Sequence, residues 1–414
     1  MMKKSILLLG LLATWCGCTN HSQQDETMET IQVLPAWENL SELKCSQLGK
    51  SIRYVPLETT DSSLIGNSYN LMLLDNHILV TTDKRALLFD KETGKYLRRI
   101  GHFGDDPEGY LENVCFANQQ THELCFPRHN KLIKYGLDGK YIGEMDFPSN
   151  GLSSSSYPLL LDNSAWVHLG QSFGGDGNFQ LYYTSGNGVK TDSILVRDGE
   201  STALNPSEIM NISVFKGKGS MAGFGLMGCN GLIYINMKND KTMLIPSFYP
   251  SLWSMDDHIR FREPYNDTIF SLKDNVLEPT MVFDMGERHL PKEKEGESVG
   301  TSQYLAVTYV IETPKVVFFQ CAKDLFSKHE MYNGVYNKKD GSVQMNNLSE
   351  GFTDDLTGFL PFNPEASNKR GEIASTVQVI DIQEWKEEHG DTNIPDALKN
   401  LKDDDNPVCV IVQP

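Results

Sequence analysis

Residues 86–110 read ALLFDKETGKYLRRIGHFGDDPEGY, and this stretch decides the fold. The apolar run Leu87–Phe89 predicts one strand, and the run Tyr96–Ile100 predicts a second. Glu92-Thr93-Gly94 between them predicts a tight turn, because glycine takes positive φ without steric cost. Gly101 then lets the backbone turn away. The stretch therefore predicts an antiparallel hairpin with a glycine-rich exit.

The same pattern returns along the chain. Residues 131–145 read KLIKYGLDGKYIGEM, with Asp138-Gly139 as the turn. Two kinds of turn alternate, one joining the inner strands of each repeat and one joining the outer strands. The inner-strand turns are expected at Asp75-Asn76, Gln119–His122, Asp162-Asn163, Cys229–Gly231, Asp256-Asp257 and Glu312–Lys315. The outer-strand turns are expected at Glu92–Gly94, Asp138-Gly139, Gly186–Gly188, Asn239-Asp240, Asp274-Asn275 and Asp340-Gly341.

Six pairs of turns predict an all-β fold, a six-bladed β-propeller of four-stranded antiparallel blades. Ser51–Leu57 precedes the first repeat and Pro407–Val412 follows the last, and we expect these N- and C-terminal strands to pair in one blade and close the ring. Helical spacing within Ile382–Lys402 predicts short helices beside the last blade. The pattern is weakest between Ser201 and Pro250, where a seven-bladed count would need its extra blade.

Residues 1–17 are predicted to be a lipoprotein signal peptide. Lys3 and Lys4 precede the apolar run Ile6–Ala13, which is shorter than the roughly 20 residues that span a bilayer. Gly17-Cys18 resembles a lipobox, which makes Cys18 the lipidated first residue, although Trp15 replaces the usual aliphatic residue. Simple secretion is the alternative. Residues 18–46 are then a lipid-anchored tether and residues 47–414 the propeller, located at the outer membrane on its periplasmic or external side.

Composition and cysteine usage narrow the classes of partner. The chain has 414 residues and a formal net charge of −18, which argues against a nucleic acid partner because phosphates need a basic face. Six cysteines follow Cys18 and none has CxxC spacing, so no zinc site is expected. Cys115 and Cys125 would face the same side if they pair directly across a turn. Either a disulfide or two buried free thiols is expected there.

Several segments carry a family resemblance in the same order along the chain. They are Leu57-Glu58-Thr59, Phe89–Tyr110, Asn266–Gly286, Gly358–Pro364 and Asn406-Pro407-Val408. With them the chain resembles the exported six-bladed β-propeller lipoproteins of Bacteroidetes, which are similar to NHL-repeat propellers. It departs from the family pattern at the exit loop, where Glu108 precedes Gly109 and one glycine is lost. The resemblance implies a fold and a location in the cell envelope, and no reaction.

Polar side chains at predicted strand ends are candidates for a binding site at one mouth of the central channel. They are His102, Arg128, His129, His168, Arg260, Arg262 and Tyr265, with Tyr110 and Trp166 as further aromatic candidates. Arginine binds carboxylates through two hydrogen bonds, and aromatic rings offer apolar faces for stacking. Each side chain could instead hydrogen-bond within its own blade. His102 lies among Asp105, Asp106 and Glu108, but a solvated loop is the simpler interpretation and no metal is expected.

The sequence contains no assignable catalytic motif. We therefore expect a membrane-anchored module that binds a glycan, peptide or protein and needs no cofactor. The alternative is a metal-dependent hydrolase or lyase, lactonase-like, with its site at the channel mouth; a structural part of an envelope complex is a third possibility. Propellers carry both binding and catalytic functions, so the fold cannot choose between them.

Overall fold

The computed structural model describes most of the chain from Met28 onward. The described residues are 28–66, 69–82, 84–111, 115–118, 121–129, 131–146, 152–154, 159–160, 165–172, 179–185, 190–197, 206–216, 231–239, 242–247, 252–255, 258–263, 266–273, 275–291, 303–324 and 330–414. The tether before residue 28, Cys18 and Tyr265 lie outside these residues, as do several predicted turns. No helix in the described part of the chain is long and apolar enough to cross a membrane.

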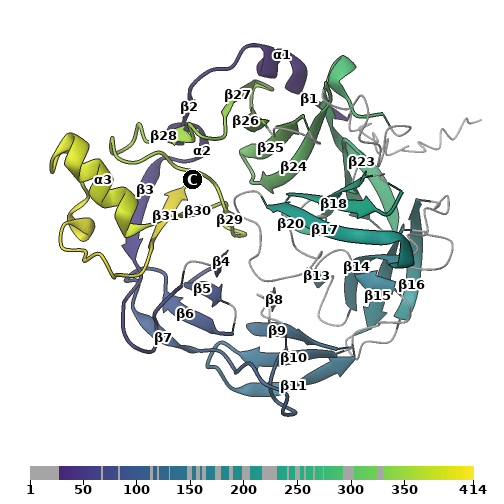
Figure 1. Ribbon diagram of the computed structural model, residues 1–414, viewed down its shortest axis with the longest axis horizontal. Helices are drawn as coiled ribbons and strands as arrows, with labels where there is room; N and C mark the ends of the chain where they lie inside the picture. Colours follow the sequence, from purple (N-terminus) through teal and green to yellow (C-terminus); the bar gives the residue numbers. More distant parts are fainter. Residues whose placement is uncertain are drawn as a thin grey trace, which may run out of the picture.

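The strands form separate sheets arranged around a ring, which is a β-propeller (Figure 1). Five sheets are built on four antiparallel strands in a row, with the first strand nearest the centre of the ring. Their strands are β4 (Tyr69–Leu73), β5 (His77–Thr82), β6 (Ala86–Asp90) and β7 (Tyr96–Arg99); β8 (Phe116–Asn118), β9 (Glu123–Arg128), β10 (Lys131–Gly136) and β11 (Tyr141–Asp146); β20 (Leu252–Met255), β21 (His258–Phe261), β22 (Thr268–Lys273) and β23 (Val276–Asp284); β24 (Leu305–Glu312), β25 (Val316–Lys323), β26 (Glu330–Asn337) and β27 (Val343–Asn347); and β29 (Ala366–Ser367), β30 (Ile373–Val377), β31 (Val408–Gln413) and β3 (Ser51–Pro56).

Two further sheets, between residues 152 and 247, are less regular. In the first, β12 (Leu152–Ser154) and β13 (Leu159–Leu160) both pair with β14 (Ala165–Ser172), which is followed by β15 (Phe179–Ser185) and β16 (Lys190–Arg197). The second has three strands, β17 (Ile209–Lys216), β18 (Gly231–Met237) and β19 (Thr242–Ser247), and the short helix η1 (Pro206–Glu208) precedes it. The predicted count of six equal blades is therefore wrong, because the structure has five regular blades, and these two irregular sheets lie one after the other between the second and the third of them.

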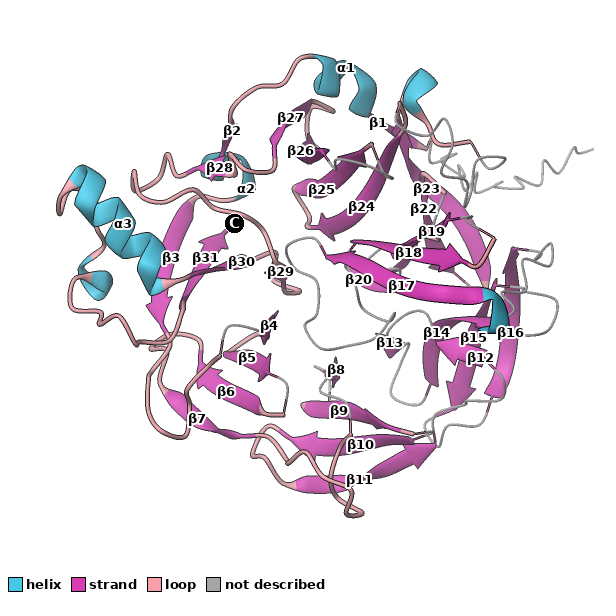
Figure 2. Ribbon diagram, in the orientation of Figure 1, coloured by secondary structure: helices cyan, strands magenta, loops and turns pink. Residues whose placement is uncertain are grey.

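The strand that precedes the first blade and the last strand of the chain meet in the last blade. Strand β3 pairs with β31 in antiparallel register from Ser51 opposite Gln413 to Pro56 opposite Val408. This confirms that the two terminal segments share a blade, although no described sheet closes on itself. The connection from β30 to β31 contains α3 (Val379–His389) and η4 (Asp396–Leu398), so short helices also occur where the sequence predicts them (Figure 2).

The core lies between neighbouring blades. Ile78, Leu79 and Val80 are consecutive in β5 and all fully buried, so this blade packs on both of its faces. Phe89 of β6 packs in one cluster with Ile411 of β31, which joins the first blade to the last. Burial of each such side chain contributes roughly 1.5–3 kcal/mol, and the contacts between blades hold the ring together.

Residues 28–48 form what we call the N-terminal strap. It contains β1 (Glu29–Gln32), α1 (Val33–Glu38), β2 (Leu43–Lys44) and α2 (Cys45–Leu48). Strand β1 pairs in parallel with the outer strand β23, and β2 pairs in parallel with β28 (Phe352–Thr353). Ile31, Leu43 and Cys45 are fully buried. The tether predicted for residues 18–46 therefore does not extend over this part, which packs against the propeller through apolar side chains.

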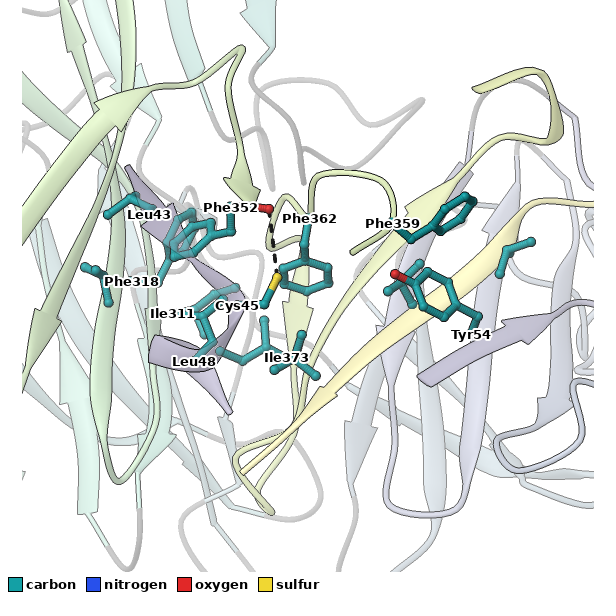
Figure 3. Close-up of a cluster of buried hydrophobic side chains, with 14 of the residues drawn as sticks. Leu43, Cys45, Leu48, Tyr54, Ile311, Phe318, Phe352, Phe359, Phe362 and Ile373 are labelled. Carbon is teal, nitrogen blue, oxygen red and sulfur yellow. Dashed lines mark hydrogen bonds between the residues drawn. The ribbon is translucent and has the colours of Figure 1, made fainter. Parts of the chain in front are cut away.

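Figure 3 shows how the N-terminal strap enters the core between the last two blades. Leu43 and Cys45 of the strap pack in one cluster with Phe318, Phe352 and Ile373. The Cys45 thiol donates to the carbonyl oxygen of Phe352, with the sulfur 3.8 Å from that oxygen. Residues about 300 positions apart in the sequence thus share one core.

Candidate functional site

The alternating direction of the strands divides the connections between two faces of the ring. The turns from first to second strand and from third to fourth strand lie on one side, which we call the turn face. The turns from second to third strand and the connections between blades lie on the other side, which we call the crossover face. Contacts agree with this division: Arg128, at the end of β9, donates from Nη2 to the carbonyl oxygen of Asp105, in the β7–β8 connection, at 2.8 Å.

The β7–β8 connection forms a compact loop on the crossover face, which we call the 101–110 loop. The amide of Gly104 donates to the Tyr110 carbonyl at 3.1 Å, and the amide of Tyr110 donates to the His102 carbonyl at 3.0 Å. Gly101 has a φ of 53°, and a Cβ there would lie 2.3 Å from the Tyr135 ring. Only glycine fits this position. The amide of Gly109 donates to the Asp106 carbonyl at 2.9 Å, so the loop also turns tightly where it departs from the family pattern.

The 101–110 loop carries two exposed polar side chains, His102 and Asp106, that contact each other. Nε2 of His102 lies 2.5 Å from Oδ2 of Asp106, and 44% and 50% of the two side chains are exposed. The hydrogen bond from His102 lowers the pKa of Asp106. Arg128 also donates to the carbonyl oxygen of Asp106. Arg128 therefore holds the loop in place, while His102 and Asp106 remain accessible.

Two aromatic side chains of the loop have different roles. Tyr110 is fully buried and stacks on Phe126 with ring centroids 4.5 Å apart. Burial raises its pKa to about 12. The prediction that Tyr110 stacks on a ligand is wrong, because the rings of Phe126 in β9 and Tyr135 in β10 pack against its buried ring. Phe103 is the exposed ring of the loop, and Nζ of Lys84 lies 5.9 Å from its centroid.

Arg260 and Arg262 join two blades. Nε of Arg260 lies 3.3 Å from Oε2 of Glu312, a carboxylate with no exposed surface that also accepts from the Trp253 indole at 2.7 Å. Nζ of Lys338 lies 2.7 Å from Oε1 of the same carboxylate. This network connects β20 and β21 to β24 and the β26–β27 turn. Arg260 is therefore committed to the interface between these blades.

Arg262 is almost fully buried and donates to the carbonyl oxygen of Val307 in β24. Its guanidinium carbon lies 5.8 Å from the centroid of the Phe283 ring. Burial lowers its pKa to about 10, with Asp267 acting in the opposite direction. The predicted ligand-binding role of Arg262 is thus wrong, because its side chain packs inside the protein. Arg260 is only partly buried, and its side chain pairs with Glu312 at the interface between the blades.

Of the remaining predicted binding residues that the structure describes, only His129 lies near His102 and Arg128. His129 is exposed beside Arg128 and has a positive φ of 52°. His168 pairs with Tyr182 through the backbone of β14. Among the described candidates, His102, Arg128 and His129 gather on the crossover face at the first and second blades. Sequence reasoning missed Phe103, although an aromatic residue between two glycines of an exit loop is a usable signal.

Strand register also decides between the two states expected for Cys115 and Cys125, a disulfide or two free thiols. Cys125 of β9 lies opposite Phe116, one residue away from Cys115. A shift of one residue moves a side chain to the other face of a sheet. Cys115 accordingly packs with Leu124 and Phe126, and both thiols are free and buried. A disulfide between Cys115 and Cys125 is therefore absent, and burial raises the pKa of both thiols.

A second polar cluster lies where β29 and β30 meet β4, close to the centre of the ring. The Glu365 carboxylate accepts from Thr376 at 2.9 Å, and Gln378 donates to the Tyr69 hydroxyl at 2.7 Å. The Tyr309 hydroxyl donates to the Glu365 carbonyl at 2.6 Å. Within the described ranges, no three side chains of His, Cys, Asp or Glu are placed to hold a metal ion. These groups satisfy one another rather than converging on an ion.

The sequence pattern that defines the family described as "Domain of unknown function (DUF4934)" matches residues 28–413. The chain belongs to this family. The match begins at the first residue of the N-terminal strap, so the strap is part of the family domain. No curated protein matches the sequence.

Solved structures support the fold. A Bacteroides fragilis protein assigned as exported is similar with a TM-score of 0.62 at 13% identity, covering 93% of this chain and 99% of that one. A protein of unknown function from Bacteroides caccae has a TM-score of 0.30 at 10% identity, covering 74% and 82% of the two chains. The extracellular domain of a hybrid two-component system from B. thetaiotaomicron has a TM-score of 0.35 at 8% identity, covering 76% and 39%. Only the first carries an argument, and it concerns the fold alone.

Proposed function

We propose that this chain is an exported outer-membrane lipoprotein, anchored through Cys18, whose propeller is a non-catalytic binding module. Its ligand is a glycan, with a peptide or a protein partner as the other candidates. The ligand binds on the crossover face beside the 101–110 loop. The observation that carries the proposal is the exposed group of Phe103, His102 and Asp106 on a loop fixed by its own hydrogen bonds.

The chemistry of this group fits a sugar. The exposed ring of Phe103 offers an apolar face, and 36% of the residue is accessible. Asp105, with 90% of its side chain exposed, and Asp106 offer carboxylate oxygens that accept hydrogen bonds from hydroxyl groups. Because the loop is already ordered, binding loses little conformational entropy.

The alternative, a metal-dependent hydrolase or lyase, has no support in the described residues. Their acidic and histidine side chains form no set of three that could bind a metal. Glu365, the carboxylate near the centre of the ring, is occupied by Thr376 and Ser375. A binding role needs no such set.

A glycan-binding screen with matched variants tests the ligand site. Phe103→Ala should weaken binding by about tenfold, since truncating a central contact costs more than 1 kcal/mol. Tyr141→Ala is the control, because Tyr141 has the same 36% exposure and lies on the outer strand β11. The control should bind as the wild type does. Equal losses in the two variants would rule out the 101–110 loop as the site.

Metabolic labelling with a fatty acid tests the anchor separately. Cys18→Ala should abolish incorporation of the label. Cys16→Ala, the neighbouring cysteine of the predicted signal peptide, should keep it. Retention of label in Cys18→Ala would mean that the anchor is elsewhere or absent.

A further inference from the structure

The turn face of the last two blades carries a group of basic side chains on a chain whose net charge is −18. We call this group the basic patch; its residues are Lys50, Lys315, Lys338, Lys339, Lys369 and Arg370. They lie in the β24–β25, β26–β27 and β29–β30 turns and just before β3. Lys50, Lys315, Lys339 and Lys369 are exposed, and none of these four forms an ion pair with another described residue.

Backbone contacts make the basic patch continuous. The amide of Lys338 donates to the carbonyl of Lys315 at 3.0 Å, which joins two turns of one blade. A Cβ at Gly371 would lie 3.3 Å from Cδ of Pro314, which brings the β29–β30 turn against the β24–β25 turn. The amide of Lys50 donates to the carbonyl of Gln413 at 2.7 Å, at the end of the same blade.

The acidic groups near the basic patch are mostly used internally. Glu312 is buried between Lys338 and Arg260, and Glu372 is buried against Lys91. Asp340 accepts hydrogen bonds from the amide and hydroxyl of Ser342, and Asp75 lies 3.9 Å from Nε of Arg370. The exposed lysines therefore outnumber the exposed acids on this part of the turn face.

The opposite side of the same blade has the opposite charge. Residues 379–407, which connect β30 to β31 on the crossover face, contain nine acidic residues and three lysines. Helix α3 alone presents exposed Glu384, Glu387 and Glu388. The molecule thus has a basic turn face and an acidic crossover face at the last blade, and an anionic surface would orient it with the turn face inward.

The first strand of the N-terminal strap begins toward the same side. Strand β1 runs parallel to β23, so Glu29 is the end of β1 that lies toward the β22–β23 turn, on the turn face. The hydroxyl of Tyr336 donates to Oε2 of Glu29 at 3.0 Å, and Tyr336 is two residues before Lys338 of the basic patch. The eleven residues from Cys18 to Met28 are joined by ten peptide units and can span at most about 35 Å. An anchor at Cys18 therefore lies within about 35 Å of Met28, the first residue of the N-terminal strap.

We propose that the basic patch is a membrane-docking surface that binds anionic phospholipid headgroups. Docking turns the crossover face, with its 101–110 loop, away from the bilayer and toward a ligand. The inference rests on the proposed function for the membrane location and adds the orientation of the molecule on it. Each lysine or arginine close to an anionic bilayer strengthens binding by about fivefold.

Vesicle co-sedimentation tests the docking surface. The full chain carrying Cys18→Ala, so that no lipid is attached, is mixed with vesicles of phosphatidylcholine alone or with about one third phosphatidylglycerol. Binding should be stronger to the anionic vesicles and should fall as salt is raised above about 0.1 M. Lys315→Gln, Lys339→Gln and Lys369→Gln together should weaken that binding by about a hundredfold, from three factors of about five.

The matched control carries the same change of charge on the crossover face. Lys84→Gln, Lys386→Gln and Lys402→Gln are exposed lysines in second-to-third strand connections, and together they should change binding by less than threefold. All variants share residues 1–27, so insertion of that segment contributes equally. The single variants Lys315→Gln and Lys369→Gln, each expected to lose about fivefold, repeat the test if a triple variant does not fold.

Equal binding to neutral and anionic vesicles, or equal losses in the two triple variants, would overturn the proposal. A loss of less than tenfold in the basic-patch variant would also overturn it. This assay needs neither lipidation nor a glycan, so its failure would leave the anchor and the ligand site standing. Failure of the labelling or glycan experiments would likewise leave the vesicle result interpretable.

Discussion

The buried ion pair between Lys91 and Glu372 allows a test of whether the first and last blades are packed together. Lys91 follows β6 of the first blade, and Glu372 precedes β30 of the last blade. Nζ and Oε2 are 2.5 Å apart, and only 2% and 8% of the two side chains are exposed. Glu372 also accepts from Asn368 at 2.6 Å and from Gln413 at 3.1 Å. The pair therefore joins the last blade, which contains β3 and the C-terminal strand β31, to the first blade.

Glu372→Gln removes the negative charge and leaves Lys91 buried without a counter-ion. Breaking a buried pair from one side costs about 3–5 kcal/mol, because the remaining charge has lost its water. Lys91→Met should cost less, since Glu372 keeps two hydrogen-bond donors. The double variant should be less destabilised than the sum of the two single changes, because neither charge is then left alone.

Urea unfolding followed by tryptophan fluorescence measures these differences in the free energy of unfolding. The control is the exposed pair of Asp396 and Lys399, whose side chains are 94% and 48% accessible at 2.5 Å separation. Asp396→Asn should change stability by about 0–1 kcal/mol. If Glu372→Gln cost no more than this control, the pair would not be buried between blades, and the joining of first and last blades described here would be wrong.

Three further predictions test local features. Gly101→Ala should lose about 1–3 kcal/mol more stability than Gly341→Ala, because both have positive φ but only the first would place a methyl group against an aromatic ring; equal urea midpoints would contradict this. Burial would raise the pKa of Asp354, but the hydrogen bonds it accepts outweigh burial and lower it. Its stabilisation is therefore present above about pH 4 and lost as pH falls further, and Asp354→Asn should flatten the acid limb of stability against pH. Cys115 and Cys125 should both react with iodoacetamide after unfolding without a reductant, and a mass showing neither modified would reveal a disulfide.

The turns were the most predictable part of the fold because their chemistry is local. Gly94, Gly139 and Gly341 have φ values of 70°, 82° and 71°, as outer-strand turns with glycine require. The predicted number of blades was wrong because other turns lack a glycine that marks them in the sequence. The β29–β30 hairpin contains a strand of two residues and the turn Asn368–Glu372, which reads as an ordinary charged loop. That blade is completed by β3 from the other end of the chain.

Predictions that depended on contacts between distant segments were the least successful. Short elements such as β1 and β2 gave no periodicity, and their burial depends on partners about 250–310 residues away. Arg260 and Arg262 lie at the end of a strand, where a ligand residue is plausible, yet their partners Glu312 and Val307 belong to the next blade. Local sequence reports that a side chain is polar, while tertiary packing decides whether another part of the protein satisfies it.

The segments that carry the family resemblance explain why family membership identifies a scaffold and not a ligand. Asn406 is buried and accepts from the amide of Ile65 at 2.8 Å. Its Nδ2 donates to the carbonyl oxygens of Glu58 and Ser63, each at 2.9 Å. The Leu-Glu-Thr segment and the closing strand thus serve to fasten the start of the propeller to its end. A residue with that role is needed whatever the protein binds, so we expect recognition to depend on exposed positions, and Phe103 and the basic patch are the ones that we propose.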